Sequence, residues 1–283
     1  MVLESIINSI GAERKPFHMF FIGMLYSSVA LLLSHWIFRD QAGIVMITLT
    51  VMASIPLLYN TVKLEEKKDT IIKEEMVLLK EHGKALLYFM FLFLGFTVSF
   101  SIWYVFLPSD MVQNLFNTQI QTYLNINAKI TGNAILSLGR FGSIFLNNLK
   151  VLMFCLLFSF LYGIGSIFIL TWNASVLAVA IGNFIRTNVS QYAESLHLFK
   201  VAGYFHVFSI GILRYMVHGI PEILSYFVAG LAGGIISIAV IRHDLGTKNF
   251  ENIILDSADL LILSFVLLVV AALLEVFVTP ILF

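Results

Sequence analysis

The chain has few charged residues and almost no cysteine, and both shortages restrict what it can be. Only 12% of its 283 residues are charged, whereas 59% are hydrophobic and the mean hydropathy is +0.92. Soluble domains carry about 25% charged residues, so we predict an integral membrane protein. Its 17 basic and 17 acidic residues cancel, which argues against a nucleic-acid partner. A single cysteine, Cys155, excludes an intrachain disulfide and a cysteine-rich metal site.

The sequence also lacks the motifs that mark common catalytic and cofactor sites. It contains no nucleophile elbow, zinc-binding His-Glu-x-x-His motif, phosphate loop or dinucleotide fingerprint. No two of its seven histidines are three or four residues apart, so no helix presents a histidine pair to a metal ion. We therefore expect a non-enzymatic protein with no catalytic residue, no cofactor and no metal site.

Long apolar runs predict an all-α, polytopic bundle of transmembrane helices. About 20 helical residues span the hydrocarbon core of a bilayer. The run at 151–185 has 35 residues without a charge, which is too long for one span. We expect either two spans there, or one span and a re-entrant piece, with a turn at 171–173. The total is then seven to eight spans. The other predicted spans are 17–38, 42–62, 85–109, 199–217, 220–241 and 260–283.

Two polar segments divide the chain. Residues 1–62 hold an N-terminal pair of spans, and 63–84 contain six lysines and six acids at helical spacing, which predicts a solvated, charged helix. The lysines place this segment and the N-terminus in the cytoplasm, so we expect a multi-pass protein of the cytoplasmic membrane. Residues 109–140 are polar but nearly uncharged, and we interpret them as an amphipathic helix on the outer surface, broken at 125–127 and 131–133. Residues 242–283 form a polar loop and a C-terminal span.

A pentad inside the apolar chain, His218-Gly219-Ile220-Pro221-Glu222, places a carboxylate at a membrane helix. Arg214, His218 and Glu222 recur every four residues, so a continuous helix would align them on one face. Because Pro221 lacks a backbone donor, we instead predict that one helix ends near Val217 and another begins at Pro221.

The pentad belongs to a candidate polar cluster that is either structural or functional. Asn147 and Lys150 stand at the start of one span, and Asn173 lies near the predicted turn. A second candidate feature is a set of glycines that lets two helices approach closely, either within the chain or in a dimer. The polar cluster comprises His218, Glu222, Arg214, Lys150, Asn147 and Asn173, and the glycines are Gly230, Gly233 and Gly234.

The order of these elements is typical of one family. Asn147-Asn148 precede a glycine-interrupted span, and Trp172-Asn173-Ala174, the His-Gly-x-x-Glu pentad and an Ala-Gly-rich helix at 227–237 follow. Over residues 85–241 this order resembles the stage II sporulation protein M family, particularly its archaeal members. The family pattern often has a proline before the histidine, where this chain has Val217. The resemblance implies a five-span core, eight spans in total, and a scaffolding role, since sporulation members scaffold cell-wall hydrolases.

The sequence is consistent with two functions of different classes, and an intramembrane enzyme is a third possibility. The first is a non-enzymatic membrane scaffold or remodelling component, a homodimer that contacts the lipid bilayer and other membrane proteins. The alternative is a channel or transporter for an ion, a small solute or a lipid, which uses polar residues near Glu222. An intramembrane enzyme would need Glu222 and a histidine to converge on a wet pocket.

Overall fold

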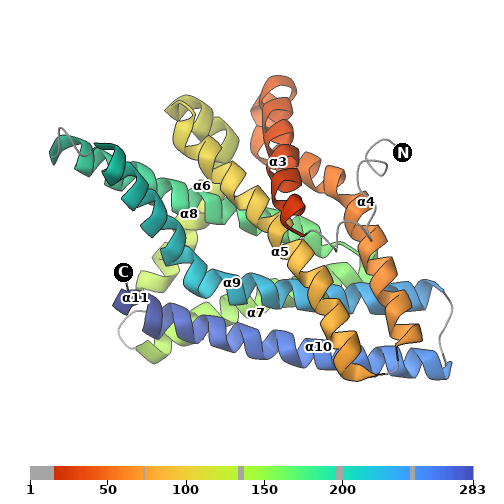
Figure 1. Cartoon of the computed structure of the whole chain (residues 1–283). Coiled ribbons are helices and arrows are strands. Elements are labelled where there is room, and N and C mark those ends of the chain that lie inside the picture. Colours follow the sequence, from red (N-terminus) through yellow and green to blue (C-terminus); the bar gives the residue numbers. More distant parts are fainter. Residues whose placement is uncertain (1–15, 73, 133–136, 196–199, 243–245, 283) are drawn as a thin grey trace.

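The computed structural model describes residues 16–72, 74–132, 137–195, 200–242 and 246–282 (Figure 1). Regular structure in these ranges is helical throughout, without a strand, which confirms the predicted all-α class. Residues 1–15 of the predicted N-terminal domain lie outside the described residues. The long helices are α3 (Phe17–Ile37), α4 (Ala42–Ile71), α5 (Glu75–Phe106), α6 (Ser109–Gly132), α7 (Ser137–Tyr162), α8 (Ser166–Ser195), α9 (Lys200–Ile241) and α10 (Lys248–Leu273); the short elements are η1 (Arg39–Gln41), the π turn η2 (Leu274–Val278) and α11 (Thr279–Leu282).

Seven of the described helices are long and apolar enough to cross a membrane, and all of the long helices except α6 belong to this set. The predicted bundle of transmembrane helices is therefore confirmed, with seven candidate spans, the lower of the two predicted numbers. The C-terminal helix α10 also begins at Lys248, whereas the sequence predicted a polar loop up to the start of the span at residue 260. Thr247 caps α10, and its side chain accepts a hydrogen bond from the Phe250 amide at 3.2 Å.

The turn in the long uncharged run lies at 163–165, so the predicted turn at 171–173 is wrong. Gly163 has a φ of +73°, a left-handed conformation that glycine adopts without a steric penalty. Asn173 lies inside α8, where its amide Nδ2 donates to the Ile169 carbonyl 2.9 Å away. That local bond satisfies the asparagine within the helix. Helix α8 is thus one continuous span, and the described chain has no re-entrant piece there.

Helix α9 continues through Pro221 for 42 residues, so the predicted break between Val217 and Pro221 is also wrong. The helix changes direction along its length (Figure 1), as helices that contain proline commonly do. Proline is tolerated in transmembrane helices because neighbouring helices and local adjustments compensate for the missing hydrogen bond. The two spans predicted at 199–217 and 220–241 therefore form one helix, which reduces the expected eight spans to seven.

Helix α6 is amphipathic and continuous through 125–127, where we expected a break. Val112, Leu115 and Phe116 are buried at three- and four-residue spacing. Gln119, one turn further, is also fully buried and donates to the Gly43 carbonyl at 3.2 Å. The buried face of α6 thus packs on the start of α4. Residues 133–136 lie outside the described part of the chain.

Helix α9 is the central element of the bundle. In the 18-residue apolar stretch of α9 that could cross a membrane, 83% of the residues are buried. In the corresponding stretches of α7 and α10, 28% are buried. It packs most extensively on α10 and α7, while α3 packs mainly on α5. A Cβ atom added to Gly230 would lie 2.7 Å from Ser166 Oγ, and one on Gly233 would lie 2.7 Å from the Leu156 carbonyl oxygen. Gly234 similarly faces the Gly163 carbonyl, so the three candidate glycines pack α9 against α7 and the α7–α8 turn within the chain.

Candidate functional site

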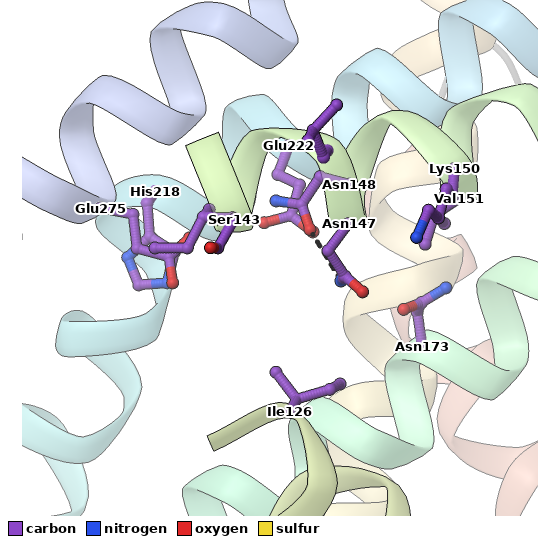
Figure 2. Close-up of a pocket in the computed structure, with 12 residues that line it drawn as sticks. Ile126, Ser143, Asn147, Asn148, Lys150, Val151, Asn173, His218, Glu222 and Glu275 are labelled. Atoms are coloured by element: carbon purple, nitrogen blue, oxygen red, sulfur yellow. Dashed lines mark hydrogen bonds between the residues drawn. The ribbon is translucent and has the colours of Figure 1, made fainter. Parts of the chain in front are cut away.

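A cavity of about 390 Å³ opens between α6, α7, α8, α9 and η2 (Figure 2). Its apolar lining includes Ile126, Ile144 and Val151. The polar side chains come from four different elements, and they include five of the six residues of the predicted polar cluster. The polar lining residues are Ser143, Asn147, Asn148, Lys150, Asn173, His218, Glu222 and Glu275.

Helix α7 contributes a polar face to the cavity. Ser143, Asn147 and Lys150 follow each other at spacings of four and three residues, which places them on one side of a helix. Asn148 is 7% exposed, and its side-chain oxygen accepts a hydrogen bond of 3.3 Å from Asn147 Nδ2. Figure 2 shows Asn148 beside Glu222, with Lys150 and Asn173 at the opposite end of the cavity from His218 and Glu275.

Helix α9 presents His218 and Glu222 to the same cavity because it continues through the proline. Tyr226, one turn beyond Glu222, is fully buried and donates its hydroxyl to Glu222 Oε1 at 2.8 Å. This bond fixes one carboxylate oxygen while the side chain still lines the cavity. His218 Nδ1 lies 3.1 Å from Thr279 Oγ1, which ties α9 to α11. The pentad therefore lies inside α9, where His218 and Glu222 line the cavity, and it does not mark the start of a helix.

Glu275 also lines the cavity, and it is absent from the polar cluster predicted from the sequence. It lies in the π turn η2, and turns of this kind occur frequently at functional sites. The fold brings it into the same cavity as His218, although the two are far apart in sequence (Figure 2). The available signal was a carboxylate inside an otherwise apolar span.

Arg214 is the one member of the predicted cluster that does not line the cavity. Its guanidinium carbon lies 5.8 Å from the centre of the Phe184 ring on α8, a cation–π contact. In the part of the chain that the structure describes, no ion pair joins Arg214 or Lys150 to Glu222. The arrangement therefore leaves two carboxylates and one ammonium group facing a shared space.

The lining is suited to holding a polar molecule by hydrogen bonds and charge. Among the described residues, no group of three or more histidine, cysteine or acidic side chains has the arrangement of a metal site. Glu222 and His218 do face one cavity, which is the arrangement that an intramembrane enzyme would also require. The same two residues serve equally as ligand contacts in a binding or transport site.

A second polar cluster lies where the ends of α4, α5 and α9 meet. His82 is 2% exposed and stands between two carboxylates of α4. Its Nδ1 lies 2.8 Å from Glu65 Oε2 in a hydrogen bond, and its Nε2 lies 3.0 Å from Asp69 Oδ1 at ion-pair distance, without hydrogen-bond alignment. Each ring nitrogen thus faces a carboxylate, which favours the doubly protonated imidazolium.

Two further cations complete this cluster. Lys68 Nζ lies 2.6 Å from Glu65 Oε1, and Arg242, just beyond α9, lies 2.7 Å from the fully buried Glu66. The predicted solvated helix at 63–84 is therefore wrong in two respects. The segment is divided between the ends of α4 and α5, and its three acids on α4, Glu65, Glu66 and Asp69, are buried.

Comparison with known proteins agrees with the resemblance seen in the sequence. The model of the family described as "Stage II sporulation protein M" matches residues 85–280, which extends past the predicted 85–241 to include α10. An uncharacterized protein of Methanocaldococcus jannaschii is 31% identical over 165 residues, covering 57% of this chain and 83% of that protein. No solved structure matches this chain. The chain therefore belongs to the stage II sporulation protein M family.

Proposed function

We propose that the protein is a non-enzymatic channel or transporter whose central cavity admits an ion, a small solute or a lipid headgroup. One observation carries the proposal: a cavity of about 390 Å³ within a bundle of membrane helices has a lining rich in carboxylates, carboxamides and an ammonium group. Ligand sites usually measure about 300–1,000 Å³. Charged side chains at membrane helices commonly mark solute pathways, because only water, a partner or a ligand offsets their desolvation.

The orientation is part of the same proposal. We place the protein in the cytoplasmic membrane with its N-terminus and the ends of α4 and α5 on the cytoplasmic side. The support is the charge bias: six of the 17 basic residues lie between 63 and 84, and basic residues concentrate on cytoplasmic segments.

Solute permeation into proteoliposomes tests the proposal. Vesicles that contain the purified chain are transferred to isosmotic potassium chloride, glycine, ethanolamine or glycerol, and swelling is followed by light scattering. We expect faster entry of at least one solute than in empty vesicles, and loss of that entry in Glu222→Gln. The matched control is Glu251→Gln, which changes an exposed glutamate at the start of α10. Swelling equal to that of empty vesicles for every solute, or equal in Glu222→Gln and the parent, contradicts the proposal.

A second candidate is a homodimeric membrane scaffold or remodelling component that recruits other membrane proteins. It is favoured by family membership and by the low burial of α7 and α10, whose apolar outer surfaces are available to lipid or a second copy. Introducing a cysteine at Leu157, which is 48% exposed on α7, tests for a dimer by crosslinking in membranes. The native Cys155 is fully buried and provides the background control. A chain that remains monomeric with crosslinkers at both α7 and α10 contradicts this candidate.

A further inference from the structure

The charges in the cavity are separated along its length. Glu275 lies at the end occupied by His218, Glu222 lies between the two ends beside Asn148, and Lys150 lies with Asn173 at the other end (Figure 2). On α7, Lys150 lies seven residue steps beyond Ser143, or about 10 Å along the helix. The cavity thus has an acidic end and a basic end that are far enough apart to contact different groups of one ligand.

Neither end forms a direct ion pair among the described residues, and the cation that acts on Glu275 from a distance is Arg140 of α7. Across the described ranges, the ion pairs involve the α4, α5 and α9 ends, and none includes Glu222, Glu275 or Lys150. Tyr226 and the carboxamide side chains supply hydrogen bonds but no positive charge. Two carboxylates that share a cavity repel each other, and a cation placed between them removes that repulsion.

The lining also restricts what kind of cation and anion fit. No phenylalanine, tyrosine or tryptophan is among the described lining residues, so the cavity lacks the cage that binds quaternary ammonium groups. A primary ammonium group, with three N–H donors, suits carboxylate acceptors. At the basic end, the Lys150 ammonium group offers three donors, which suit the terminal oxygens of a phosphate group. The amides of Asn147 and Asn173 each donate one hydrogen bond within the protein, so each adds only its second N–H.

We propose that the cavity binds a zwitterion that carries a primary ammonium group and a phosphate ester. The ammonium group lies against Glu222 and Glu275, and the phosphate group lies beside Lys150. This inference rests on the proposed function, because it names the ligand of the same cavity. The chemistry has two sources, the headgroup of an ethanolamine phospholipid and a free phosphoethanolamine-type solute.

Native mass spectrometry of the full chain in detergent tests the ligand. The probes are phosphatidylethanolamine, phosphatidylcholine and phosphatidylglycerol with identical acyl chains. We expect phosphatidylethanolamine to bind about tenfold or more tightly than the other two lipids, because each of them lacks the primary ammonium group. Equal binding of phosphatidylethanolamine and phosphatidylcholine overturns the proposal. Competition by soluble phosphoethanolamine identifies a free solute, and retained ethanolamine selectivity without competition identifies the lipid headgroup.

Two variants examine the two ends separately. Glu275→Gln and Lys150→Gln each should weaken phosphatidylethanolamine binding about tenfold, since each removes one charge-assisted contact. Lys150 is exposed, so its variant keeps the fold even if Glu275→Gln does not. The matched control is Lys67→Gln, an exposed lysine on α4. Unchanged affinity in Lys150→Gln overturns the assignment of the basic end.

Different experimental results would contradict the proposed ligand and the proposed transport function. Loss of ethanolamine selectivity with Glu222-dependent swelling intact overturns the zwitterion and leaves the channel or transporter. Selective binding that is lost in Lys150→Gln, without any swelling, supports the zwitterion site and overturns permeation of ions and small solutes.

Discussion

Replacing His82 by glutamine removes the cation that lies between two buried carboxylates. Glutamine has a similar size and retains N–H donors, but it carries no charge. Glu65 keeps a second cation, because Lys68 Nζ lies 2.6 Å from its other oxygen. Asp69 is 7% exposed, and its ion pair with His82 at 3.0 Å is the one recorded for it among the described residues. The loss therefore falls mainly on Asp69.

The expected cost follows from this burial. Removing one partner of a buried ion pair costs about 3–5 kcal/mol, because a charge remains in a poorly solvated site. Since Lys68 still compensates Glu65, we expect a loss near the lower limit, about 3 kcal/mol. At roughly 2–4 °C per kcal/mol, Tm falls by about 6–12 °C. The companion variant His82→Gln with Asp69→Asn removes the stranded charge, so it should recover at least half of the loss.

Thermal unfolding of the purified chain in detergent measures these changes. The control is Lys80→Gln, which alters an exposed lysine on the same helix and should leave Tm within about 1 °C. A loss of less than about 1 kcal/mol in His82→Gln would refute the reasoning. So would a double variant that is less stable than His82→Gln, because the carboxylate of Asp69 would then not be the source of the cost.

Two further predictions concern helix packing and the second ion pair. In Gly95→Leu the added side chain meets the Phe20 carbonyl oxygen of α3, so unfolding in detergent should show a loss of about 1–3 kcal/mol or more. Gly83→Ala, also on α5 but with no atom within 4 Å of the added carbon, should instead gain about 0.5–1 kcal/mol, and equal effects would contradict this packing. Arg242→Gln removes the guanidinium from buried Glu66 and should cost about 1–2 kcal/mol, reduced by the 39% exposure of the arginine side chain; an unchanged midpoint would contradict the ion pair.

The sequence was sufficient to predict a membrane protein, because apolar runs of about 20 residues are a strong signal of transmembrane helices. Its local propensities were less reliable within the membrane. Asn173 favours turns in water, but within α8 it bonds to a carbonyl of its own helix, and the turn formed instead at Gly163, which takes a positive φ. Pro221 breaks helices in soluble proteins, yet α9 continues through it. In both places the continuity of a membrane helix outweighed the preference of a single residue.

The cavity could be predicted only in part. His218 and Glu222 share a face once α9 is continuous, and Asn147 and Lys150 share one on α7. Glu275 could not be assigned, because its position depends on how the C-terminal helix packs. The burial of Glu65, Asp69 and His82 was missed for the same reason: a charged segment normally indicates solvent, and only the three-dimensional packing pairs these charges.

Binding and transport both depend on a water-accessible polar cavity within the membrane bundle. Cysteine accessibility in native membranes measures whether water reaches this cavity, with a charged, membrane-impermeant thiol reagent applied from each side. Asn147→Cys, on the cavity wall, should react, and soluble phosphoethanolamine or Glu222→Gln should change its rate. Leu157→Cys faces lipid and the native Cys155 is fully buried, so both should stay unmodified. An Asn147→Cys chain that is as unreactive as these two controls would contradict the account.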